Sequence, residues 1–93
     1  MRIVGYIENE ACKITVFHMG LRFMVKFEDG LYEQAFKFRE SDKIKGLNDI
    51  QNLIDKTFVQ EVMHRFSEMR IATGNLLDRY IGTVEEENEE EII

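Results

Sequence analysis

The sequence predicts an α+β fold, in which a four-stranded antiparallel β-meander is followed by one or two C-terminal helices packed on one face of the sheet. Two patterns lead to this prediction. In residues 1–39, apolar and polar side chains alternate in short runs, as they do in strands that bury one face. In residues 48–81, apolar side chains recur at helical intervals. A single domain, residues 1–82, contains both patterns.

The clearest element is a central hairpin made of residues 21–28 and 31–39. Apolar side chains alternate with polar ones along both strands, and Asp29-Gly30 lies between them. This dipeptide favours a two-residue type I′ turn, because both residues tolerate positive φ angles. With the turn centred there, Phe23 faces Phe36 across the inner face of the hairpin.

Two further strands, residues 2–8 and 12–18, precede this hairpin. Two-residue loops at Asn9-Glu10 and at Met19-Gly20 would bring the apolar side chains of all four strands to the same face. That agreement between independent loop assignments supports the meander. An apolar face of this size has to be covered, and the C-terminal part of the chain supplies the cover.

The cover is predicted as helices over residues 48–56 and 58–81, either one kinked helix or two separate ones. Asn48 is the expected N-cap of the first segment, because Gln51 follows three residues later in a capping-box pattern. Gly82 is expected to end the second segment. Residues 83–93 are predicted to be a disordered acidic tail, since like charges dominate them.

The net charge is −6 and is unevenly distributed along the chain. Residues 1–39 carry +1, and residues 40–93 carry −7. This acidity argues against bulk nucleic-acid binding. No apolar run is long enough to span a membrane, and the N-terminus does not resemble a signal peptide. One cysteine permits no internal disulfide, which fits a reducing compartment, and we expect a cytoplasmic protein.

Residues with catalytic or metal-binding chemistry are few and isolated. His18 and His64 have no histidine or cysteine partner at ligand spacing and are expected to be ordinary surface histidines. Cys12 is expected to be a buried small apolar side chain rather than a reactive thiol. The sequence therefore predicts no catalytic residue, no metal site and no cofactor, and we expect a protein that is not an enzyme.

The outer face of the sheet is the one surface with a recognisable pattern. Its predicted cross-strand pairs include Lys26 with Glu33, and its cations and apolar side chains are interleaved. Three interpretations are open: a solvated face whose cations cover the aromatic rings, a protein-binding or homodimer surface, and a platform for single-stranded nucleic acid. The candidate binding residues on this face are Val4, Tyr6, Lys13, Phe17, Arg22, Met24 and Lys26.

Several stretches resemble a known group of sequences. MRIVGYIE, ITVFHM, VKFEDGLYEQAFKFR and EVMHRF, with the acidic end, are similar to a family of short bacterial proteins of unknown role found in Bacteroidetes. The resemblance implies a bacterial cytoplasmic protein and brings no site residues with it. The order of four strands and a helix also resembles the repeat of Pur-type and Whirly-type single-stranded nucleic-acid-binding proteins, at the level of fold.

The functional prediction follows from the outer face and from the lack of a chemical site. We expect a small interaction module that self-associates or binds a partner protein through the outer face. The alternative is a protein that binds single-stranded nucleic acid through the same basic and aromatic residues.

Overall fold

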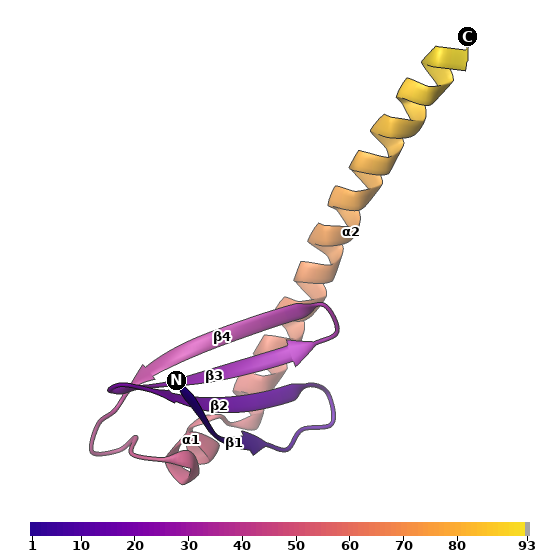
Figure 1. Cartoon of the computed structure of the whole chain (residues 1–93). Coiled ribbons are helices and arrows are strands. Elements are labelled where there is room, and N and C mark those ends of the chain that lie inside the picture. Colours follow the sequence, from indigo (N-terminus) through magenta and orange to yellow (C-terminus); the bar gives the residue numbers. More distant parts are fainter. Residues whose placement is uncertain (93) are drawn as a thin grey trace.

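A four-stranded antiparallel sheet in the order β1-β2-β3-β4 forms the body of the molecule (Figure 1). The computed structural model describes the backbone of residues 1–92 and the side chains of residues 1–82. The elements follow one another as β1 (Arg2–Ile7), β2 (Lys13–Met19), β3 (Arg22–Asp29), β4 (Tyr32–Arg39), α1 (Leu47–Leu53) and α2 (Lys56–Ile92). The predicted α+β meander with C-terminal helices is therefore confirmed.

Both tight hairpin loops are glycine-leucine pairs, which corrects the predicted loop positions. Gly20 and Gly30 have φ angles of 59° and 62°, and no other residue in the described part of the chain has a positive φ. Glycine with positive φ at the first loop position alone is the pattern of a type II′ turn, whereas the type I′ turn predicted at Asp29-Gly30 needs two such residues. Leu21 and Leu31 follow these glycines and are exposed.

The moved loops change the cross-strand partners but not the faces. Phe23 faces Phe38 rather than Phe36, and Lys26 faces Ala35 rather than Glu33. Moving a loop centre by one residue moves each partner by two, and residues two apart on a strand share a face. The inner face consequently keeps its predicted apolar character although the pairing differs.

A β-bulge interrupts β1 at Val4. The pairing passes from Ile3↔Phe17 directly to Gly5↔Val16, so Val4 is the extra residue. Val4 packs against the core cluster. A Cβ atom on Gly5 would overlap the side chain of Leu47, so α1 approaches β1 where β1 has no side chain.

The core lies between the inner face of the sheet and the two helices. Its buried apolar residues come from β2, β3, α1, the α1–α2 junction and the first part of α2, and they are Ile14, Val16, Phe23, Val25, Phe27, Ile50, Ile54, Val62 and Phe66. Phe58 packs edge-on against two rings of the sheet, with centroid distances of 5.8 Å to Phe27 and 5.0 Å to Phe36. These rings fix the start of α2 on β3 and β4.

The helical region is two helices, which decides between the two arrangements that the sequence left open. The break lies at Ile54 and Asp55, and the Oδ1 atom of Asp55 accepts a hydrogen bond of 2.8 Å from the backbone N–H of Phe58. Asp55 therefore has the geometry of an N-cap for α2. The predicted cap at Asn48 is wrong, since α1 begins at Leu47 with Gly46 in the N-cap position.

Helix α2 is longer than predicted and projects far beyond the sheet (Figure 1). Its backbone continues through Gly82 to Ile92, because a single glycine weakens a helix by only about 1 kcal/mol and does not stop it. The molecule is correspondingly elongated, with extents of 69 × 26 × 17 Å. The side chains of residues 83–92 and all of Ile93 lie outside the described residues, and the predicted disorder of this tail stays a prediction.

Candidate functional site

The outer face of the sheet is more closed than the sequence suggested. Phe17 lies at its centre, flanked by Ile3 on β1 and by Met24 on β3. The Nζ atom of Lys26 lies 5.3 Å from the centroid of the Phe17 ring, and Phe17 is only 9% exposed. The cation thus covers the ring, as long cationic side chains do on apolar surfaces.

Tyr6 is the more accessible ring of this face. It is 54% exposed, and the Nζ atom of Lys13 lies 6.0 Å from its centroid. A nucleic-acid base could reach Tyr6, but it would have to displace Lys26 to stack on Phe17. The geometry therefore weakens the nucleic-acid alternative, which stays a prediction.

Two of the residues assigned to the outer face belong elsewhere or stand apart. Val4 faces the core because of the β1 bulge, and the sequence offered no signal for that bulge except Gly5. Ile3 takes its place on the outer face and is 52% exposed. Arg22 lies on the outer face, two residues before Met24, but at the end of the hairpin, where it pairs with Met19 and Arg39. Tyr6, Lys13, Phe17, Met24 and Lys26 do share the outer face, as predicted from their alternation.

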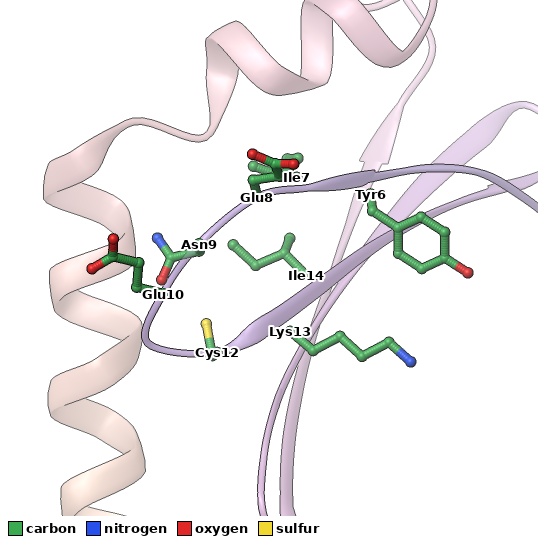
Figure 2. Close-up of a pocket in the computed structure, with 8 residues that line it drawn as sticks. All are labelled: Tyr6, Ile7, Glu8, Asn9, Glu10, Cys12, Lys13 and Ile14. Carbon is green, nitrogen blue, oxygen red and sulfur yellow. The ribbon is translucent and has the colours of Figure 1, made fainter.

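A hollow of about 580 Å³ lies at the connection between β1 and β2 (Figure 2). The connection spans residues 8–12 rather than the predicted two, and Asn9 Oδ1 accepts a hydrogen bond of 2.8 Å from the N–H of Ala11. Cys12 lies in this hollow. Burial, and secondarily the negative charge of Asp29, raises the pKa of the Cys12 thiol above its ordinary value. The thiol is thus held in its less nucleophilic form.

The two histidines are both next to glutamates. His18 Nε2 lies 2.7 Å from Glu40 Oε1, and His64 Nε2 lies 3.2 Å from Glu68 Oε1. Within the described side chains, no group of three or more histidine, cysteine or acidic residues is arranged to hold a metal ion. No helix in that part of the chain is both long enough and apolar enough to cross a membrane.

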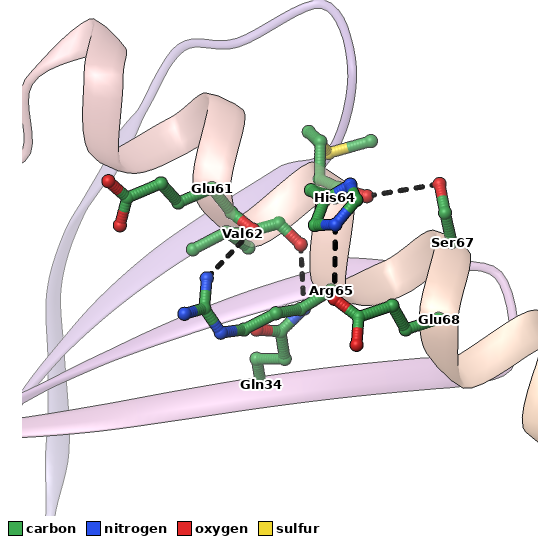
Figure 3. A network of polar contacts seen from close by, with 8 residues as sticks. Gln34, Glu61, Val62, His64, Arg65, Ser67 and Glu68 are labelled. Carbon is green, nitrogen blue, oxygen red and sulfur yellow. Dashed lines mark hydrogen bonds and ion pairs between the residues drawn. The ribbon is translucent and has the colours of Figure 1, made fainter.

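Polar contacts fix α2 to the sheet at two points. In the network of Figure 3, the side-chain amide of Gln34 on β4 donates a hydrogen bond of 2.9 Å to the carbonyl of Val62. Farther along α2, Arg70 Nη1 lies 2.9 Å from Asp29 Oδ2, at the turn between β3 and β4. The second contact lies where α2 leaves the sheet, and it joins the start of the projecting part to the hairpin turn.

Beyond Arg70, α2 carries an apolar stripe that the described residues leave uncovered. Leu76, Leu77, Tyr80 and Ile81 are 55%, 52%, 68% and 52% exposed, and we call these four residues the α2 stripe. At 100° per residue, the stripe lies within about 80° of the direction of Phe66, which is fully buried against the sheet. The α2 stripe therefore continues the face that packs on the sheet.

The sequence analysis expected the whole helix over residues 58–81 to cover the sheet and so missed this surface. A length argument could have found it. Strand β4 has 8 residues, or about 26 Å, and a helix covers that span with about 17 residues. Helix α2 has 37 residues, so about half of it must extend past the sheet. Its half-buried residues do end near Met69 and Thr73.

Comparisons with known proteins add no relative. The chain matches no protein-family model, and no curated protein and no solved structure is significantly similar to it. The resemblance to short Bacteroidetes proteins accordingly stays a prediction.

Proposed function

We propose that this protein is a small, non-enzymatic interaction module that binds protein partners through the α2 stripe. The observation that carries the proposal is the exposure of four large apolar side chains in a row on one helix. Scattered exposed apolar residues are normal on protein surfaces, but a contiguous set on a projecting helix is typical of a docking surface. Amphipathic helices commonly bind partners through residues spaced in this way.

The position of the α2 stripe supports the same function. Gln34 and Arg70 hold α2 against β4 and the β3–β4 turn, so the stripe is presented on a fixed support. The outer face of the sheet is a weaker candidate for the main contact, because Lys26 already covers Phe17. Ile3, Tyr6 and Met24 form a smaller surface there that a large partner could also contact. The single cysteine fits a reducing compartment, and we propose a cytoplasmic location.

A capture experiment with matched variants tests the proposal. The full-length wild type, the Leu77→Glu/Ile81→Glu double variant and the Ile71→Glu control are each immobilised and exposed to an extract of the native cells. Ile71 is 64% exposed but points about 140° away from Phe66, so it lies off the stripe. We expect the double variant, but not the control, to lose protein partners, including added copies of the chain. Equal capture by all three proteins, each with native circular dichroism, would refute the proposal.

A further inference from the structure

We propose that the occupant of the α2 stripe is the α2 stripe of a second copy of this chain, packed antiparallel. This inference rests on the proposed function and names the partner. The four-stranded bodies of the two protomers would then lie at opposite ends of a short two-helix junction.

The stripe is self-complementary in this orientation. If a two-fold axis passes between Asp78 and Arg79, Leu76 of one copy faces Ile81 of the other, and Leu77 faces Tyr80. Each stripe residue then has an apolar partner, and the same surface is used on both copies, as two-fold symmetry requires. Residues spaced three and four apart along α2 give the narrow apolar seam of a helix pair.

Charge selects the antiparallel orientation over the parallel one. Residues 85–91 contain six glutamates, and this run begins four residues after the end of the stripe. A parallel pair would bring two such runs side by side, and like charges at neighbouring helix positions repel. In the antiparallel pair, the two acidic runs leave the junction at opposite ends, so they do not meet.

The body of the protomer leaves room for this pairing. The last α2 residue that packs against the core cluster is Met69, and the ion pair between Arg70 and Asp29 marks the end of the sheet along the helix. The stripe begins more than one helical turn later, on the part of α2 that extends into open space in Figure 1. A second helix can therefore lie along the stripe if it crosses α2 at an angle, so that its far end passes beside the sheet, which lies on the same face of α2.

The first test is the oligomeric state of the full-length protein, measured by sedimentation velocity over a wide concentration range. We expect a concentration-dependent dimer for the wild type. Leu77→Glu should weaken dimerisation by about 100-fold or more, because the substitution is present on both copies and buries a charge in each. Ile71→Glu introduces the same glutamate at a position off the stripe and should leave the dimer unchanged. Circular dichroism and thermal melting confirm that both variants are folded.

The second test measures the orientation with a spin label at residue 68. The protein carries Cys12→Ser and Glu68→Cys, so that the label occupies one exposed position on α2. In the antiparallel pair the two labels are 21 residues apart along the helix axis, or about 31 Å. In a parallel pair they lie at the same height on the outer sides of the two helices, because Glu68 points about 160° away from Phe66, and their distance lacks this axial part and is correspondingly shorter.

The outcomes separate this inference from the proposed function. A monomer at every concentration, or a dimer that Leu77→Glu leaves intact, overturns self-pairing through the stripe, and a short distance between labels overturns the antiparallel orientation. If the wild type is a monomer but its captured partners still depend on Leu77 and Ile81, the proposed function stands and only the identity of the partner is wrong. If capture is the same for all variants, the proposed function itself fails.

Discussion

Replacing Phe66 by alanine tests whether α2 holds the fold together through the face that packs on the sheet. Phe66 is fully buried, and its removal leaves a cavity between α2 and the sheet. Phe→Ala changes at such sites cost about 3–5 kcal/mol. A chain of 93 residues has a free energy of unfolding of about 5–14 kcal/mol, so the variant would lose a large part of its stability.

The measurement is urea unfolding followed by circular dichroism, with thermal melting as a second probe. For a domain of this size, each kcal/mol lowers Tm by about 4–8 °C, so we expect a fall of at least about 12 °C. Glu68→Ala is the matched control, because Glu68 lies on the same helix with its side chain 64% exposed. It should change the free energy of unfolding by less than about 0.5 kcal/mol.

Protein concentration has to be varied in this experiment, because any self-association through α2 would add to the apparent stability. The difference between Phe66→Ala and the wild type should persist at the lowest concentration. A loss below about 1 kcal/mol there, with an unchanged dependence on urea, would show that α2 does not pack on the sheet through Phe66, and the description of the core would be wrong.

Three further predictions concern the hairpin turn, the helix anchor and the thiol. Gly30→Ala should destabilise the fold by about 1–2 kcal/mol because of the positive φ at this position. Leu31→Ala is the control and should have little effect, because the Leu31 side chain is 97% exposed. Equal effects of the two substitutions in chemical unfolding would contradict the type II′ turn. Gln34→Ala should cost about 0.5–1.5 kcal/mol by removing the hydrogen bond to Val62, and the exposed neighbour Glu33→Ala serves as its control. Because the pKa of Cys12 is raised in the fold, its effect on stability is absent below the ordinary thiol pKa of 9.0, and stability should fall as the pH rises above that value. Cys12→Ala should lack this fall in unfolding measured from pH 7 to pH 10, and an identical pH profile in both proteins would show that burial does not hold the thiol protonated.

The fold class was predictable because the alternation in the strands is insensitive to small errors in the loops. The hairpin loop was assigned to Asp29-Gly30 and lies at Gly30-Leu31, yet Phe23 and Val25 still face the core. The error at each of the two glycine-leucine loops moved the partners by two residues, and a two-residue shift preserves the face. The turn type itself was not predictable from Asp29-Gly30, since Gly30 can serve either as the second residue of a type I′ turn or as the first of a type II′ turn.

The candidate site was predicted less well, because it depends on contacts between elements. Cation covering of Phe17 was one of the interpretations open from the sequence, and the Lys26 distance now favours it. The inward rotation of Val4 depends on a bulge, and a bulge leaves no clear mark in the alternation of six residues. The α2 stripe was missed for a different reason: helical periodicity shows which residues share a face, but only the length of the sheet shows where that face runs out of cover.

The bulge in β1 has a consequence for the solubility of the folded sheet. In the order β1-β2-β3-β4, β1 and β4 are the outermost strands, and their outward backbone groups could pair with strands of other molecules. A regular β1 would offer the segment RIVGYI, which is rich in strand-forming residues and contains no acidic side chain. The extra residue at Val4 bends this strand and breaks the regular spacing that an added strand would need. On β4, the charged side chains of Glu33, Lys37 and Arg39 are exposed and disfavour the addition of a strand from another molecule. Neither edge of the sheet is therefore a ready template for fibrils.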